Sequence, residues 1–485
     1  MEFDATEIAN LIKTKQLSPK EAVMNAFSEI KTKNGQLNAV VSLREEKALE
    51  EAKRCVDLAR PFAGVPILLK SLGQYLKGEP ATDGSKLFKD AKATQTDNFV
   101  KALQQAGFII IGQSNAPEFG FTNVTDSKLY GPARNPWNPD FYSGGSSGGA
   151  ASAVAASAVA SKMVPLAAAS DGGGSIRIPA SFTGLIGLKP TRGRTPVGPS
   201  SWRGWQGASV SFAITRSIRD TASLLAAVQT VQPPAPFQTP LLSFNLEDPL
   251  PKNRKVAFSL NSPVQTKVSE AAKQAVLSAV NFLEEQGFEV EEAEPKLDGT
   301  QLIKDYYLVN DVESAVMFSN IENALERKLK IDDMELISWC ICQAGMDVKA
   351  TDYSRMLANW DQAAFVMDAF LEKYSFFLTP TTAQTAPEVS HQFINESMRA
   401  KMRRISELSS RERTDLVYEF FMPSLAATPF TQQANLMGNP AISLPVHVAS
   451  NGLPLGVQFV AKKGREDLLL KMGRLFEQNG KFRII

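Results

Sequence analysis

Apolar positions along the chain alternate between helical and extended spacing. In residues 97–113 (DNFVKALQQAGFIIIGQ), apolar residues recur at helical intervals as far as a Gly-Phe pair and then run continuously. Residues 271–292 (AAKQAVLSAVNFLEEQGFEVEE) repeat this order. Helical spacing followed by a short extended stretch predicts a helix and then a strand. The alternation of the two predicts an α/β fold, in which helices cover a sheet.

The pattern changes in the second half of the chain. Residues 231–243 (VQPPAPFQTPLLS) are rich in proline, which cannot continue a helix, so a connector is predicted there. Residues 300–425 have mostly helical spacing, and residues 439–461 return to strands around a turn. The helical part either covers a cleft built by the rest of the chain or belongs to its core, and periodicity does not separate these alternatives.

Length and charge narrow the classes of function. The 485 residues include 52 Lys and Arg against 51 Asp and Glu, so no excess charge points to nucleic acid or to a membrane surface. The amino terminus lacks the pattern of a signal peptide, and the alanine-rich residues 150–169 are too polar to span a bilayer. We therefore expect a cytoplasmic protein with a small, neutral substrate.

Two clusters of glycine carry serines. The first, SGGSSGG, occupies residues 143–149 before an alanine-rich helix, and the second, DGGGS, occupies residues 171–175. Glycines allow backbone N–H groups to converge on one point, where they stabilise a carbonyl oxygen under nucleophilic attack. A turn or a linker is the alternative for either cluster alone. A phosphate-binding loop is disfavoured, because no G-x-x-x-x-G-K-[ST] pattern surrounds these glycines.

A serine nucleophile requires a base to remove its proton. The two histidines, His391 and His447, follow a loop and lie in an apparent strand, so we predict structural roles for both. Lys70 ends an apolar run in AGVPILLKSLG (63–73), which predicts a buried strand that carries the Lys70 amine into the interior, where burial would keep it neutral and able to act as a base. The alternative is an amine that reaches back to water.

Cysteines offer little chemistry in this chain. Cys55, Cys340 and Cys342 are too few for a disulfide framework, and the last two supply at most two ligands where a closed zinc site needs four. We predict buried structural thiols at these positions.

Several stretches, in this order, closely resemble the amidase signature family of serine hydrolases. They are GVPILLK, GQSNAPEFGFT, GPARNPWNP, GGSSGG, SDGGGSIRIPASFTGLIGLKPTRGR and NLMGNPAISLPV with GLPLGVQFVA. The opening DATEIANLIKTKQLSPKEAV is similar to the amino-terminal helices of that family, so the resemblance covers nearly the whole chain. It implies one amidase domain with a large mixed, twisted sheet that helices cover on both faces.

The resemblance also divides this domain along the chain. Residues 1–60 would form amino-terminal helices, and residues 61–230 the catalytic core with the signature motifs. Residues 231–425 would hold the connector and the mostly helical region over the cleft. Residues 426–485 would add the strands and helix that complete the core.

The resemblance implies a Ser-cisSer-Lys triad without histidine. Ser175 matches the nucleophile, Lys70 the base, and Ser146 the bridging serine that passes the proton between them. The predicted oxyanion hole is the backbone of Gly172, Gly173, Gly174 and Ser175. Asp171 and Arg177 match a charged pair that braces the nucleophile loop. An ordinary surface ion pair, worth about 0–1 kcal/mol, is the alternative for that pair.

These matches imply hydrolysis of a small neutral amide, linear or cyclic, through an acyl-serine. The motifs look most like the branch with bacterial amidases and 6-aminohexanoate cyclic dimer hydrolase. The alternatives are the catalytic subunit of glutamyl-tRNA amidotransferase and an inactive binding protein with the same fold. Against the first of these, residues 195–207 (TPVGPSSWRGWQG) lack the expected Tyr-Gly-Arg-Val-Ser continuation. No metal or organic cofactor is implied, and a homodimer is suggested.

Two features depart from the family pattern. Ser146 and Ser175 are 29 positions apart, a longer spacing than usual, because ASAVA at 151–155 repeats at 156–160. Five residues inserted within a helix would turn its face by about 140° beyond a full revolution, so we expect an added turn at the far end of the helix or a loop near SKMVP to absorb them. Ser71 follows Lys70 where the family commonly has aspartate, which would favour a neutral Lys70 if that carboxylate faced the amine.

Overall fold

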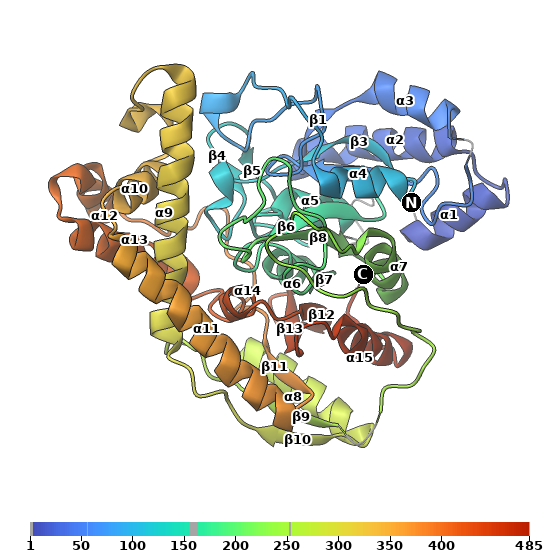
Figure 1. The fold of residues 1–485 in the computed structure, drawn as a ribbon. Helices are drawn as coiled ribbons and strands as arrows, with labels where there is room; N and C mark the ends of the chain where they lie inside the picture. Colours follow the sequence, from blue (N-terminus) through green and yellow to red (C-terminus); the bar gives the residue numbers. More distant parts are fainter. Residues whose placement is uncertain (1–2, 56, 156–162, 252–253, 485) are drawn as a thin grey trace.

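A sheet of eleven strands runs through the molecule (Figure 1). The computed structural model describes residues 3–55, 57–155, 163–251 and 254–484. In spatial order the strands are β1 (Val40–Leu43), β3 (Ile109–Ser114), β2 (Pro66–Lys70), β6 (Ala167–Asp171), β8 (Val210–Thr215), β7 (Ile186–Lys189), β12 (Ala441–Val448), β13 (Pro454–Val460), β11 (Phe376–Pro380), β9 (Lys255–Phe258) and β10 (Glu289–Glu292). A separate pair joins β4 (Asp126–Ser127) and β5 (Gly131–Pro132).

The sheet is mixed. β2 runs parallel to β3 and β6, and β9 runs parallel to β10 and β11. The strands between β6 and β11 pair antiparallel with their neighbours, as β1 does with β3. This arrangement confirms the predicted α/β class with a large mixed sheet.

Helices pack on both faces of the sheet. On one face, α5 (Gly148–Val154) contacts α6 (Arg177–Thr183), which lies on β7, β12 and β13. The other face carries α7 (Ile218–Val228), α8 (Glu270–Glu285) and α15 (Glu466–Gln478). Ser443 and Leu444 show that these faces are opposite, because Ser443 faces Ser181 of α6 while Leu444 reaches Gly473 of α15. Successive side chains of a strand point to opposite faces.

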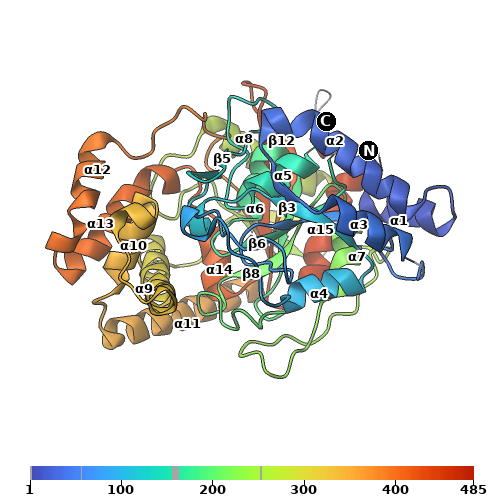
Figure 2. The same cartoon turned by 90° about the horizontal axis from the view of Figure 1, so that it is seen from above.

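The helices at the two ends of the molecule are grouped by their place in the chain (Figures 1 and 2). One group is α1 (Ala5–Lys13), α2 (Pro19–Leu37), α3 (Glu45–Lys53) and α4 (Asn98–Gln105). At the other end, the helical layer consists of α9 (Gly299–Leu325), α10 (Leu336–Gly345), α11 (Ala350–Lys373), α12 (Glu396–Arg403) and α13 (Ser410–Leu425). The short 3-10 helices are η1 (Lys86–Phe88), η2 (Glu118–Gly120), η3 (Ile331–Asp333) and η4 (Ile405–Glu407).

Local sequence accounts for most of these elements. Residues 97–113 form α4 and β3, and residues 271–292 lie in α8 and β10, as their spacing predicts. Ser18 begins α2 with a capping box, in which its hydroxyl accepts from the Glu21 N–H and the Glu21 carboxylate accepts from the Ser18 N–H. β11 is the exception, because a buried five-residue strand inside the mostly helical region 300–425 was not predicted.

The helical layer borders the centre of the sheet. α9 contacts α10, α11 and α13, and it also contacts α14 (Gln432–Met437), which leads into β12. α14 therefore links the helical layer to the strands that carry the signature motifs. None of the helices in the described ranges combines the length and the apolar character that crossing a membrane requires.

Candidate active site

Lys70 is the last residue of β2 and lies inside the molecule. Its side chain is 1% exposed, and its Nζ is 2.7 Å from Ser146 Oγ and 3.0 Å from Ser170 Oγ. The Lys70 N–H donates to Gln74 Oε1, and Gln74 Nε2 donates to the Ala169 carbonyl of β6. β2 and β6 therefore hold the amine beside two hydroxyl groups, which corresponds to the buried strand that the apolar run predicts.

Burial makes the Lys70 amine a candidate base. Desolvation lowers the pKa of Lys70 from 10.5 to about 7, although the charges of Asp171 and Asp83 oppose this effect. A lysine with a pKa near 7 is neutral often enough to accept a proton. The alternative that Lys70 reaches back to water does not hold, because its side chain is almost completely covered.

The two glycine clusters meet beside Lys70. Ser147 of the first cluster donates its hydroxyl to the Ser170 carbonyl at 3.3 Å, and the Ser170 N–H donates back to Ser147 Oγ at 3.4 Å. Ser146 follows a cis peptide bond from Gly145. The hydroxyl nearest the amine thus comes from the first cluster, while the second cluster begins at the end of β6.

Ser175 lies in the turn between β6 and α6. Its side chain is partly exposed, so a substrate carbonyl can approach it. Among the described residues, no acceptor binds the N–H groups of Gly172, Gly173 or Ser175. The Gly174 N–H donates to Asp171 Oδ1 at 2.7 Å. Because that N–H already has a strong acceptor, we leave it out of the proposed oxyanion donors, which corrects the expectation for Gly174.

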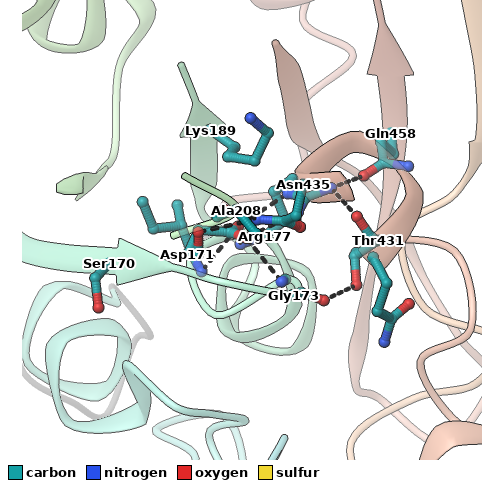
Figure 3. Close-up of polar contacts among 12 residues, drawn as sticks. Ser170, Asp171, Gly173, Arg177, Lys189, Ala208, Thr431, Asn435 and Gln458 are labelled. Carbon is teal, nitrogen blue, oxygen red and sulfur yellow. Dashed lines mark hydrogen bonds and ion pairs between the residues drawn. The ribbon is translucent and has the colours of Figure 1, made fainter. Parts of the chain in front are cut away.

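Asp171 and Arg177 form a buried ion pair (Figure 3). Arg177 Nε and Nη2 donate to the two carboxylate oxygens at 2.9 and 2.8 Å, and both side chains are 0% exposed. Burial by itself would raise the pKa of Asp171, but the charge and hydrogen bonds of Arg177 outweigh it and lower that pKa to about 2. The alternative of an ordinary surface pair is therefore wrong.

Three residues that sequence reasoning missed complete this network. Arg177 Nη1 donates to the Thr431 carbonyl at 2.8 Å and to Gln458 Oε1 at 2.7 Å. Asn435 Nδ2 donates to the carbonyl and carboxylate of Asp171, at 2.9 and 2.8 Å. The Thr431 hydroxyl donates to the Gly173 carbonyl at 2.6 Å (Figure 3).

No local spacing could have identified these partners. Asn435 is 264 positions from Asp171, although it lies in the quoted NLMGNP stretch. Ser170 was easier to identify from the sequence, because it directly precedes Asp171, the first residue of the second cluster. The network shows that residues from the carboxyl-terminal part of the chain hold the shape of the nucleophile loop.

The repeated ASAVA lies between Ser146 and Ser175, and in the described part of the chain Ser146 Oγ contacts Lys70 Nζ whereas no hydrogen bond joins Ser146 to Ser175. α5 ends at Val154, and the Met163 N–H donates to the Ala153 carbonyl at 3.1 Å. α5 therefore ends before the second copy of ASAVA begins, so the five repeated residues are not inserted within this helix and do not rotate its face. The second copy, at 156–160, lies outside the described residues, as do the first two residues of the SKMVP stretch.

Ser71, which follows Lys70, is uncharged, and its hydroxyl makes no hydrogen bond to the Lys70 amine. Ser71 is buried, and its Oγ has no hydrogen-bond partner in the described part of the chain. Asp83 is the carboxylate that acts on Lys70 besides Asp171, and it accepts from the Tyr75 hydroxyl at 2.7 and 2.9 Å. Burial raises the pKa of Asp83 to about 6.

The histidines and cysteines stand outside this arrangement. His447 lies in β12, as its sequence context predicts, and burial lowers its pKa. Cys340 and Cys342 are buried and Cys55 is half-buried, and all three thiols are free. Within the described ranges, no group of three or more His, Cys, Asp and Glu side chains is arranged to hold a metal ion.

Comparisons with known proteins give matches over nearly the whole chain. A family model described as Amidase matches residues 21–470. The chain is 43% identical over 478 residues to a lipoamidase of Enterococcus faecalis, covering 98% of this chain but 63% of that protein, less than two thirds of its length. It is 33% identical to a 6-aminohexanoate-cyclic-dimer hydrolase of Paenarthrobacter ureafaciens, covering 98% and 94%. A structure of 6-aminohexanoate cyclic dimer hydrolase with substrate superimposes with a TM-score of 0.88 at 31% identity, covering 99% and 97%.

Proposed function

The chain belongs to the amidase family of amide-hydrolysing enzymes, and we propose that it cleaves a small neutral amide through an acyl intermediate on Ser175. The observation that carries this proposal is the Lys70 amine, buried and 2.7 Å from Ser146 Oγ where the two glycine clusters meet. A neutral amine in contact with a serine hydroxyl can begin a proton relay that activates a second serine.

In the proposed first half-reaction, Ser175 attacks the amide carbonyl carbon. Ser146 passes its proton to Lys70 Nζ and takes the proton of Ser175 Oγ, while Oγ bonds to the carbonyl carbon. The N–H groups of Gly172, Gly173 and Ser175 are the proposed donors to the negative oxygen. The carbon–nitrogen bond then breaks as the same relay returns a proton to the leaving nitrogen.

In the second half-reaction, water cleaves the acyl-serine. Water gives one proton to the relay and bonds to the acyl carbon, and Ser175 Oγ takes a proton back as the carboxylic acid leaves. Asp171 and Arg177 keep the nucleophile loop in place during both steps, because their ion pair joins that loop to the residues after 430.

The relatives guide the choice of substrate. One is named a lipoamidase and another a 6-aminohexanoate-cyclic-dimer hydrolase, so both printed names describe hydrolases of amides. We propose a linear or cyclic amide of this kind for the present chain. The homodimer and the cytoplasmic location remain predictions, as does the division into a single domain with the four parts given above.

Single substitutions test the assignment. We expect Ser175→Ala and Lys70→Ala to abolish turnover of simple amides, while the matched controls His391→Ala and His447→Ala keep it. A fluorophosphonate probe should label the unsubstituted chain at Ser175, as read by mass spectrometry. A strong loss in either histidine variant would contradict the lysine-based relay.

The purified chain should act on simple amides without a partner. Glutaminase activity that appears only with added partner subunits would instead favour the glutamyl-tRNA amidotransferase alternative. A folded chain that neither turns over amides nor accepts the probe would indicate an inactive binding protein.

A further inference from the structure

The loop at residues 201–207, here called the strap, passes beside the nucleophile loop (residues 171–175). Trp205 and Gln206 adopt left-handed backbone conformations, with φ of 49° and 52°. Bulky residues rarely take this conformation, which persists only where the surrounding structure determines it. The strap belongs to the stretch 195–207, whose departure from the amidotransferase pattern the proposed chemistry does not explain.

Trp205 and Tyr306 each touch one glycine of the nucleophile loop. A Cβ atom on Gly172 would lie 2.9 Å from the Trp205 ring, and one on Gly173 would lie 2.3 Å from the Tyr306 hydroxyl. The two rings also meet each other edge to face, with centroids 6.1 Å apart. Trp205 comes from the strap and Tyr306 from α9, so two distant segments form one aromatic wall.

The strap is fastened to the helical layer. Gln206 Nε2 donates to Glu313 Oε1 of α9 at 2.9 Å, and the same oxygen accepts from the Tyr353 hydroxyl of α11. On the other side, Arg192 Nε donates to the Gly207 carbonyl at 3.0 Å. These bonds hold Trp205 in one place beside the site.

The aromatic wall of Trp205 and Tyr306 is partly exposed to solvent, as the proposed nucleophile Ser175 is. Trp205, Tyr306 and Ser175 are all half-buried, whereas the apolar cluster behind the two rings is buried and includes Leu302 and Val309. In the described part of the chain, the Tyr306 hydroxyl has no hydrogen-bond partner. Apart from the Tyr306 hydroxyl, the two rings present an apolar surface, and such a surface that stays partly uncovered beside a reacting carbonyl can bind an apolar group of the substrate.

We propose that Trp205 and Tyr306 bind the acyl chain of the substrate and select amides whose acyl group is an uncharged chain of several carbons. This inference rests on the proposed function, since it places the substrate carbonyl at the N–H groups of Gly172 and Gly173. The substituent on that carbonyl then lies against the rings that touch these two glycines.

A series of acyl p-nitroanilides tests this assignment. The unsubstituted chain should favour octanoyl over acetyl in kcat/KM by at least about tenfold, since each added methylene that packs on the two rings is removed from water. Trp205→Ala should lower this octanoyl-to-acetyl ratio at least about tenfold, and Trp205→Phe should lower it less. Trp202→Ala is the matched control, because Trp202 lies in the same strap but packs on Gly198. It should keep the ratio of the unsubstituted chain.

Labelling by fluorophosphonate separates the two proposals. A chain that is labelled at Ser175 but shows no preference for longer acyl groups would overturn the acyl-chain assignment and leave the hydrolase proposal standing. The same would follow if Trp205→Ala and Trp202→Ala gave equal ratios. A preference found with acetamides of longer amines, and absent from the acyl series, would also overturn it.

Discussion

The acid limb of the pH–rate profile is a direct test of the Lys70 environment. Burial lowers the pKa of Lys70 from 10.5 to about 7, a change that corresponds to about 5 kcal/mol of lost stabilisation of the charged amine. The proposed reaction requires the neutral form, which increases as pH rises. With this pKa the neutral fraction is about one tenth at pH 6 and about nine tenths at pH 8. The rate should therefore increase about tenfold between these values.

Asp83 allows a second test, because the direction of its effect on the pKa of Lys70 is known. Its charge raises the pKa of Lys70, and its own pKa of about 6 leaves it ionised over most of the range in which Lys70 titrates. Asp83→Asn removes this charge while keeping the size of the side chain and an acceptor for the Tyr75 hydroxyl. The midpoint of the acid limb should move to lower pH in this variant.

The assay measures kcat/KM for hydrolysis of one p-nitroanilide from pH 5 to 9, with the unsubstituted chain and with the Asp83→Asn variant. Circular dichroism at each pH confirms that the protein stays folded, and fluorophosphonate labelling at pH 8 confirms that Ser175 remains reactive. A flat profile, or a midpoint near the ordinary lysine value, would refute the neutral-amine argument. A midpoint that moves to higher pH in Asp83→Asn would refute the electrostatic account.

Substitutions at three further positions test the network around the nucleophile. Ser146→Ala should lower kcat by about 10²–10⁴, the usual contribution of a proton-transfer group, and activity close to that of the unsubstituted chain would exclude the relay. Thr431→Val removes the hydroxyl that donates to the Gly173 carbonyl, so it should reduce kcat about tenfold or more with little change in KM. Thr431→Ser keeps a hydroxyl and should keep kcat close to that of the unsubstituted chain. Equal kcat values for the valine and serine variants would contradict this positioning role. Asp171→Asn leaves the buried Arg177 charge without its partner, so it should lower the free energy of unfolding by about 3–5 kcal/mol. Urea denaturation at neutral pH measures this loss. A loss under about 1 kcal/mol would show that the pair does not brace the loop.

Sequence reasoning was strongest where one local signal was sufficient. Helical spacing that ended at Gly-Phe predicted α4 with β3 and α8 with β10, and the proline-rich residues 231–243 indeed form no helix or strand. The apolar run before Lys70 predicted a buried strand with the amine at its end. β11 was missed because a short apolar run between long helices has no period of its own.

Contacts between distant segments could not be predicted in this way. Asn435, Thr431 and Gln458 reach the nucleophile loop from more than 250 positions away, and nothing in their local sequence shows which loop they bind. The charges of Asp171 and Arg177 were visible in the sequence, but their complete burial was not. Periodicity likewise does not show that the helical part borders the site, which follows from the contact of Tyr306 with Gly173.

The amino-acid sequence by itself determined the α/β class, the two glycine clusters and the order of the motifs that relate this chain to the amidases, because these depend on residue type and local spacing. Only the tertiary structure decided that Lys70 lies beside Ser146, that the Gly174 N–H is occupied by Asp171, and that Trp205 meets Tyr306. Desolvation and hydrogen-bond geometry depend on which segments pack together, and that packing is a property of the folded chain as a whole.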